Sequence, residues 1–222
     1  MANTSEKEPL FSKKNIGLVK DPLTDNNPVT VQVLGICSAL AITAELNASV
    51  IMALSVIFVL GVGNVVISLM RNVIPSSIRI IAQLVVVAAL VIIVDLTLKA
   101  YVPDLAKKLS VFVGLIITNC IIMGRFEAFA LGNTPWKSFL DGVGNAAGYG
   151  LILVIVGFFR ELLGSGKLFG IPVLGDPVEK TGLYATGYEN NGFMLLAPMA
   201  LITLGLIIGF QRSRNKNLIE TH

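Results

Sequence analysis

Charged residues are scarce in this sequence. Asp, Glu, Lys and Arg make up 14% of the 222 residues, and hydrophobic residues make up 54%. Soluble globular domains carry about 25% charged residues, so this composition is typical of an integral membrane protein. The net charge of +3 is small and the cations flank apolar runs. They therefore resemble interfacial anchors that face the lipid bilayer, and not a nucleic-acid interface.

Histidine is almost absent, because His222 at the end of the chain is the only one. The sequence therefore gives no support to haem ligation or to histidine-based acid–base chemistry. The glycine-rich stretch 164–167 lacks the preceding strand that a phosphate-binding loop requires. We therefore expect no catalytic residue and no bound nicotinamide in this chain. The first 25 residues also lack the apolar segment of a cleavable signal peptide.

Six apolar runs predict an all-α integral membrane protein with six transmembrane segments. The runs cover residues 29–44, 46–70, 80–94, 109–124, 142–159 and 192–210. A helix rises about 1.5 Å per residue and needs about 20 residues to cross a bilayer. The first and fourth runs have 16 residues each and are predicted to be half-helices, the first of them beginning near Pro28. The predicted organisation is a mobile N-terminal tail, one membrane domain and a basic C-terminal tail, over residues 1–25, 26–211 and 212–222.

The distribution of Lys and Arg predicts the orientation of the chain in the membrane. The two termini and the loops on their side carry 11 Lys and Arg residues, whereas the loops on the opposite side carry 6. Cytoplasmic segments of membrane proteins are enriched in these residues. Both termini are therefore predicted to be cytoplasmic.

The two halves of the membrane domain resemble each other weakly. The motif G-V-G-N occurs at 61–64 and again at 142–145, and Cys37 corresponds to Cys120. The offsets differ by two residues, so chance similarity between apolar segments is the alternative. Three segments per half is an odd number, so a duplicated half inserts upside down, and such inverted repeats place sites at the membrane midplane. The predicted repeats cover about 26–101 and about 109–211.

Cys37 and Cys120 are the only cysteines, and each falls within one of the short runs. In helices that begin at Val29 and Leu109 they would lie about 12 Å and about 16 Å along the axis, near the middle of the bilayer. Each can be read as an inert small hydrophobe, and the pair as a disulfide or as metal ligands. Thiolates favour iron–sulfur clusters or zinc, which take four ligands. Two thiolates make half of such a site, so a second chain, a copy or a paralogue, would supply the other half.

Two acids lie at the edges of apolar runs. Asp95 precedes Lys99 by four residues, a spacing that allows a helical ion pair, and Asp141 directly precedes the fifth run, where it can cap a helix. The alternative is a role in cation entry or proton relay, because acids at membrane depth are often functional. Glu161, next to Arg160, is predicted to be a solvated or locally paired charge.

Four stretches of the sequence resemble a known family. They are G-I-C-S-A-L-A at 35–41, N-C-I-I-M-G-R-F-E-A-F-A at 119–130, S-F-L-D-G-V-G-N at 138–145 and G-F-F-R-E-L-L-G-S-G-K-L-F-G at 157–170. The chain resembles the NqrD/RnfE family from about Asn26 to Phe210. Members of this family are membrane subunits of the sodium-translocating NADH:quinone oxidoreductase and of a related ferredoxin:NAD oxidoreductase. The resemblance implies a multi-pass protein of the bacterial inner membrane.

The resemblance also implies a cofactor and partners. Cys37 and Cys120 match the family's two cysteines, which bind an intramembrane iron centre, usually [2Fe-2S], together with a paralogous NqrE-like subunit. This centre would pass electrons across the bilayer between subunits that carry flavins, while the complex oxidises NADH, reduces ubiquinone and exports sodium. Asp95 and Asp141 match acids linked to sodium uptake. A small secondary transporter built from inverted repeats is the alternative function.

Overall fold

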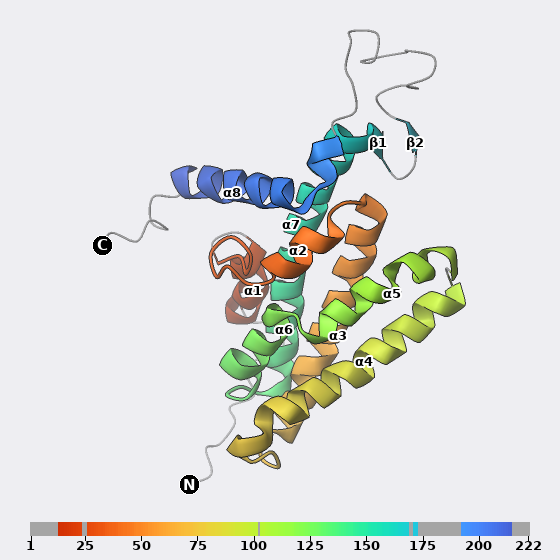
Figure 1. Cartoon of the computed structure of the whole chain (residues 1–222). Helices are drawn as coiled ribbons and strands as arrows, with labels where there is room; N and C mark the ends of the chain where they lie inside the picture. The colour runs from red at the N-terminus through yellow and green to blue at the C-terminus, as the bar shows by residue number, and fades with distance from the viewer. Residues whose placement is uncertain (1–12, 24–25, 102, 169–170, 173–191, 215–222) are drawn as a thin grey trace, which may run out of the picture.

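The computed structural model describes residues 13–23, 26–101, 103–168, 171–172 and 192–214. Within these ranges the chain is almost entirely helical, and a short antiparallel hairpin is its only sheet (Figure 1). The elements are α1 (Lys13–Lys20), η1 (Asp21–Leu23), α2 (Ile36–Ile42), α3 (Leu46–Met70), η2 (Ser76–Ile78), α4 (Arg79–Tyr101), α5 (Pro103–Ile117), α6 (Cys120–Arg125), the π-helical turn η3 (Phe126–Ala130), α7 (Pro135–Ser165), β1 (Lys167–Leu168), β2 (Ile171–Pro172), η5 (Gly192–Leu195) and α8 (Ala197–Arg214).

Four helical segments of the described chain are long and apolar enough to cross a membrane. They are Leu46–Met70, Arg79–Tyr101, Phe112–Ala130 and Pro135–Ser165. The apolar part of α8, Ala197–Ser213, is shorter, and in Figure 1 this helix runs crosswise to α7. The prediction of a helical, multi-pass membrane protein is therefore confirmed.

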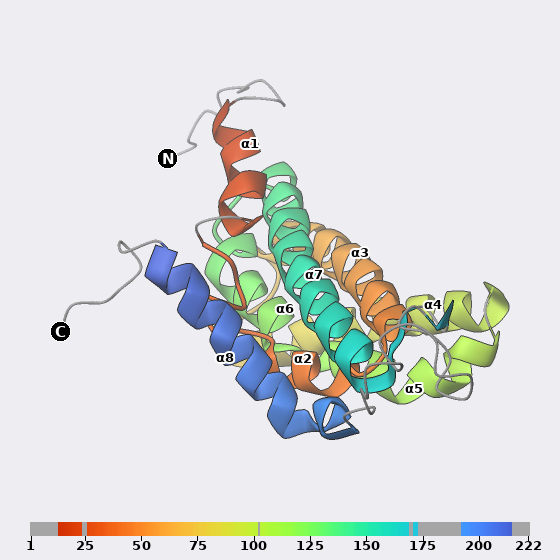
Figure 2. The same cartoon turned by 90° about the horizontal axis from the view of Figure 1, so that it is seen from above.

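Helices α3 and α7 form the centre of the fold and lie side by side (Figure 2). Their close approach depends on glycines of α7. A Cβ added to Gly142 would lie 2.7 Å from Nδ2 of Asn64 and 2.9 Å from the carbonyl oxygen of Leu60, and one added to Gly150 would lie 2.8 Å from Cβ of Ala53. Small residues let helix backbones approach closely in membranes. The two G-V-G-N motifs, at 61–64 and 142–145, consequently meet at this interface.

Helix α7 begins earlier than the apolar run that predicts it. The fifth run starts at Gly142, but α7 starts at Pro135 and continues for 31 residues. Thr134 is the N-cap residue, and Pro135 fits the first turn because proline has no amide hydrogen to leave unpaired. Asp141 therefore lies inside α7, and the prediction that it caps a helix is wrong.

The first and fourth apolar runs are interrupted and are not continuous helices. In the first, Val33 and Gly35 have φ angles of 58° and 78°, in the left-handed region, so the chain enters α2 only at Ile36. The prediction of a helix that begins near Pro28 is therefore wrong. In the fourth, α5 ends at Ile117 and α6 begins at Cys120. Asn119 restarts the helix by accepting a 3.2 Å hydrogen bond from the amide of Ile121.

Part of the predicted N-terminal tail lies against the core. Residues 13–23 form α1 and η1, which contact α7. Two further glycines of α7 permit this contact, because a Cβ at Gly144 would lie 2.8 Å from the carbonyl oxygen of Leu18 and one at Gly148 would lie 2.5 Å from that of Pro22. Residues 1–12 and 215–222 lie outside the described residues, so the division into tails and membrane domain stays a prediction.

Candidate functional site

Cys37 and Cys120 line one cavity. Its volume is about 130 Å³, and its lining residues come from the two interrupted runs: Gly35, Cys37, Ser38, Leu115, Thr118, Asn119 and Cys120. Both cysteines are free thiols and both are exposed. The fold thus brings together two thiols that lie 83 residues apart in the sequence.

Each cysteine lies at the start of a short helix, directly after a break. Cys37 is the second residue of α2 and Cys120 is the first residue of α6. The amide of Gly35 donates a hydrogen bond of 2.8 Å to Sγ of Cys120. This bond joins the segment before one cysteine to the sulfur of the other. Hydrogen bonds to sulfur influence the potential of metal–thiolate centres.

A buried hydrogen-bond network fixes both short helices to α7. The hydroxyl of Ser38 donates to the carbonyl oxygen of Gly35 at 2.9 Å. Ser38 Oγ therefore accepts from the hydroxyl of Tyr149, at 2.6 Å, and from Nδ2 of Asn119, at 3.3 Å. Because Asn119 also caps α6, the network connects α2, α6 and α7 behind the cavity.

These residues fit half of a metal site. No group of three or more His, Cys, Asp or Glu residues in the described part of the chain is arranged to hold a metal ion. An iron–sulfur or zinc site with four thiolates needs two more than this cavity offers. The exposure of Cys37 and Cys120 leaves both sulfurs accessible to ligands from a second chain.

Asp95 forms the ion pair that its spacing predicts. Nζ of Lys99 lies 2.6 Å from Oδ2 of Asp95, and the aspartate side chain retains 25% of its accessible surface. The prediction of an i,i+4 pair on one helix is therefore confirmed. The pair lies on α4, whereas Asp141 lies on α7, so the two acids have separate surroundings.

Asp141 is buried in a different kind of ion pair. Nε of Arg125 donates to its Oδ2 at 2.9 Å, and a second bond joins Nη2 of Arg125 to Oδ1. Nδ2 of Asn145 also donates to Oδ1, at 3.1 Å. The guanidinium carbon of Arg125 lies 5.5 Å from the centre of the Phe129 ring. Asp141 thus connects α7 to the end of α6, the helix that begins at Cys120.

Three oxygens near Asp141 are buried without a hydrogen-bond partner in the described chain: Oδ1 of Asn64, Oγ of Ser138 and Oδ1 of Asn145. Nδ2 of Asn64 donates to the carbonyl oxygen of Ser138 at 2.9 Å, and Oδ1 of Asn64 takes no part in this bond. Buried polar atoms are seldom unsatisfied without a reason. None of these three residues is among the predicted site residues. The signal in the sequence was the asparagine that ends each G-V-G-N motif, a polar residue inside an apolar run.

Arg160 and Glu161 are buried, with 1% and 8% of their surfaces exposed. The prediction that Glu161 is a solvated or locally paired charge is wrong, because its carboxylate accepts a hydrogen bond from the backbone amide of Leu46. Sequence spacing gave no sign of this contact, which joins residues 115 positions apart.

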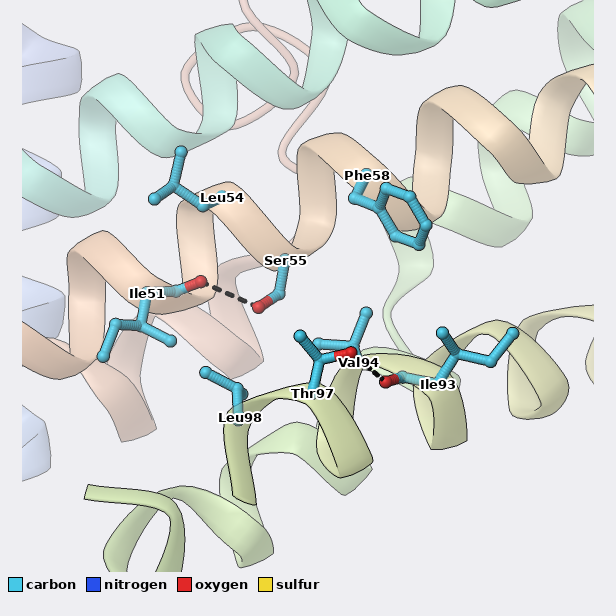
Figure 3. Close-up of a pocket in the computed structure, with 8 residues that line it drawn as sticks. All are labelled: Ile51, Leu54, Ser55, Phe58, Ile93, Val94, Thr97 and Leu98. Carbon is cyan, nitrogen blue, oxygen red and sulfur yellow. Dashed lines mark hydrogen bonds between the residues drawn. The ribbon is translucent and has the colours of Figure 1, made fainter. Parts of the chain in front are cut away.

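An apolar groove lies between α3 and α4 and offers no chemistry of its own (Figure 3). Its volume is about 340 Å³, and its two polar residues are Ser55 and Thr97. Their hydroxyls donate to carbonyl oxygens of their own helices, those of Ile51 and Ile93, both at 2.8 Å. The groove therefore presents a mostly apolar surface.

The fold and the thiol cavity define a class: a multi-pass membrane protein with two interrupted apolar runs, each of which carries one cysteine in the short helix that follows its break. Residues 15–208 match the family described as "Rnf-Nqr subunit, membrane protein". The chain belongs to this family. The resemblance that the four sequence stretches indicated is thus confirmed.

Two relatives show the same relationship over nearly the whole chain. The chain is 53% identical to a protein of Pasteurella multocida that is named as the D subunit of the Na(+)-translocating NADH-quinone reductase, over 94% of this chain and 98% of that protein. It is 54% identical to the protein of the same name from Photobacterium profundum, over 94% of this chain and 93% of that protein.

Proposed function

We propose that this chain is the D-type membrane subunit of a sodium-translocating NADH:quinone reductase in the bacterial inner membrane. The names of the two relatives and their identity of 53% and 54% support this proposal. NAD and flavins would bind to other subunits of the complex. The chain's own contribution would be to the passage of electrons through the membrane.

Cys37 and Cys120 would supply two thiolate ligands to an iron–sulfur centre, usually [2Fe-2S], that a paralogous NqrE-like subunit completes. The single observation that carries this proposal is that both thiols are free, exposed and part of one cavity. When bound, the centre would supply reversible one-electron transfer between flavin-bearing neighbours. The Gly35 amide would stabilise the charge on the Cys120 sulfur, and Ser38, Asn119 and Tyr149 would hold both ligands in position.

The membrane topology would be six crossings in two inverted repeats, with both termini in the cytoplasm. The order of elements supports this proposal, because each half contains a short interrupted element, a long central helix and a further helix. The first half has α2, α3 and α4, and the second has α5 with α6, α7 and α8. The packing of the two G-V-G-N motifs against each other is what a duplicated half would produce at its symmetry axis.

Asp141 would belong to the sodium pathway. Its support is the set of unpartnered buried oxygens of Asn64, Ser138 and Asn145 on or beside α7. Sodium is a hard cation and takes carboxylate, amide and hydroxyl oxygens as ligands. Arg125 would have to release the Asp141 carboxylate for an ion to use it, because it now occupies both oxygens. Asp95, partly exposed beside Lys99, would act where the ion enters or leaves.

The test of the proposed function is the iron content of the purified complex. Cys37→Ala and Cys120→Ala should each remove the iron and stop electron transfer to quinone, while the subunits still assemble. Thr118→Ala is the matched control, because Thr118 lines the same cavity without a sulfur. It should leave the iron in place. Full iron occupancy in either cysteine variant would refute the iron role.

A subunit of a ferredoxin:NAD oxidoreductase is the second candidate, because the family's description covers both Rnf and Nqr subunits. The electron donor of the purified complex separates the two. Reduction of quinone by NADH supports the first proposal, and activity only with ferredoxin supports the second. Solute uptake by the isolated chain in vesicles, independent of both thiols, would favour a secondary transporter instead.

A further inference from the structure

Neighbouring charges on α7 bind opposite ends of the corner between α2 and α3. Arg160 contacts the C-terminal end of α2, and Glu161 contacts the N-terminal end of α3. Only three residues, 43–45, separate the two helices. Adjacent positions on one helix thus hold both sides of the turn that follows the Cys37 helix.

All of the hydrogen-bond partners described for Arg160 are neutral oxygens. Its guanidinium donates to the carbonyl oxygen of Leu40 at 3.4 Å and to the hydroxyl of Thr43. On its other side it donates to the carbonyl oxygens of three consecutive residues that lead into α8, Met194, Leu195 and Leu196, at 3.1, 2.7 and 3.3 Å. The last carbonyls of a helix lack intrahelical partners and carry partial negative charge, so a cation is favourable there.

Glu161 supplies a cap that the local sequence lacks. Glu45 occupies the N-cap position of α3, but its side chain makes no capping hydrogen bond. The Glu161 carboxylate accepts from the amide of Leu46 in its place. The start of α3 is therefore fixed from α7, and the end of α2 that precedes it is fixed from the adjacent residue of the same helix.

Helix α2 depends on these contacts because it has only seven residues. Isolated helices of this length are unstable in water, since nucleation is costly and few hydrogen bonds follow it. Its N-terminal end is held through Ser38 and Tyr149, and its C-terminal end through Arg160. Cys120, in contrast, lies on α6, which Asn119 and Arg125 hold by other contacts.

We propose that Arg160 is a positioning residue for Cys37: it fixes the C-terminal end of α2 and thereby the place of the Cys37 sulfur, without a comparable effect on Cys120. The importance of Arg160 for a metal centre rests on the proposed function. Its effect on the placement of the Cys37 thiol does not depend on a metal, so the placement and the iron role can be tested separately.

Thiol alkylation in the assembled complex tests the placement. One background carries Cys120→Ala and reports on Cys37, and the other carries Cys37→Ala and reports on Cys120. Arg160→Met, added to each, should raise the rate of maleimide labelling at Cys37 about tenfold and leave the rate at Cys120 within about twofold. Arg160→Lys, which keeps the charge but makes fewer hydrogen bonds, should give an intermediate rate at Cys37.

Arg71→Met is the matched control, because Arg71 also donates to a backbone carbonyl, that of Asn133 at 3.0 Å, but is exposed and follows the C-terminal end of α3, the end away from α2. It should change neither rate. An unchanged rate at Cys37, or an equal rise at both cysteines, would overturn the proposal. If Arg160→Met does not assemble, the labelling rates at Cys37 and Cys120 are compared in Arg160→Lys instead.

A spectroscopic measurement extends the test to the complex with both cysteines. At equal iron content, Arg160→Lys should alter the EPR line shape of the centre, and Arg71→Met should not. An unchanged labelling rate at Cys37 refutes the positioning role whatever the spectrum shows, and an unaltered spectrum refutes its extension to the metal centre. Iron that persists in Cys37→Ala would instead refute the proposed function and leave the labelling result valid.

Discussion

The amide of Gly35 donates a hydrogen bond to Sγ of Cys120, across 2.8 Å. Gly35 precedes Cys37 by two residues, so the segment that leads into one thiol's helix binds the sulfur of the other thiol. The segment that precedes α2 and the Cys120 sulfur thus form one structural unit, and a change at Gly35 should be felt at Cys120.

Gly35→Ala should disrupt this unit. Gly35 has a φ of 78°, and a Cβ there would lie 2.6 Å from Cδ1 of Ile121 and 3.0 Å from Cε2 of Tyr149. The left-handed conformation costs about 1–2 kcal/mol in a residue with a Cβ, and overpacking adds about 1–3 kcal/mol. We expect the variant complex to lose most of its iron, which metal analysis of the purified complex measures.

Gly205→Ala is the control for this change. Gly205 lies in α8, and a Cβ there would meet no atom within 4 Å. Alanine is also the better helix former, so stability should be unchanged or slightly higher. Normal iron content in Gly35→Ala would show that the loop can relax without moving Cys120.

Tyr149→Phe should weaken the hydrogen-bond network behind the cavity without removing the iron. The variant loses the 2.6 Å hydrogen bond to Ser38, and Asn119 still donates to the same oxygen. A single hydrogen bond of this kind contributes about 1 kcal/mol. We expect a lower thermal unfolding midpoint at unchanged iron content. Tyr101→Phe, at a position that is 82% exposed, should leave the midpoint where it is.

Composition and run length were sufficient to predict the membrane class, the long helices and the two unusual runs. They did not predict where the unusual runs break. The first break depends on left-handed φ angles at Val33 and Gly35, and valine gives no such signal in a sequence. The second break could have been predicted, because Asn119, directly before Cys120, is a good N-cap residue.

The surroundings of Asp141 show a different limit of sequence reasoning. Its place before an apolar run suggests a cap, but the pair Thr134-Pro135 starts the helix seven residues before the predicted start. A threonine followed by proline is itself a helix-start signal, which the boundaries of apolar runs alone do not reveal. The partner Arg125 was not predictable, because it depends on how α6 packs against α7.

Asp141→Asn should destabilise the complex, because it leaves Arg125 partly buried without a counter-charge. Removing one member of a buried ion pair costs about 3–5 kcal/mol. We expect a clear loss of assembled complex from membranes, measured as its yield after purification. Arg125→Gln combined with Asp141→Asn removes both charges and should recover much of this loss.

The double variant also separates stability from sodium transport. If Asp141 belongs to the sodium pathway, the recovered complex should still show quinone reduction that responds poorly to sodium. A normal sodium response in the double variant would limit Asp141 to a structural role. Full assembly of Asp141→Asn alone would show that the ion pair contributes little.

Asp95→Asn should have little effect on stability, because the pair with Lys99 is partly exposed and lies within one helix. Such pairs contribute about 0.3–0.5 kcal/mol. If the Asp95 charge attracts sodium, the variant should need more sodium for half-maximal quinone reduction. Lys99→Gln is the informative partner variant, because it removes the neighbouring positive charge. Lys99→Gln should need less sodium for half-maximal quinone reduction. If the sodium requirement shifts in the same direction in both variants, or shifts in neither, Asp95 does not belong to the sodium pathway.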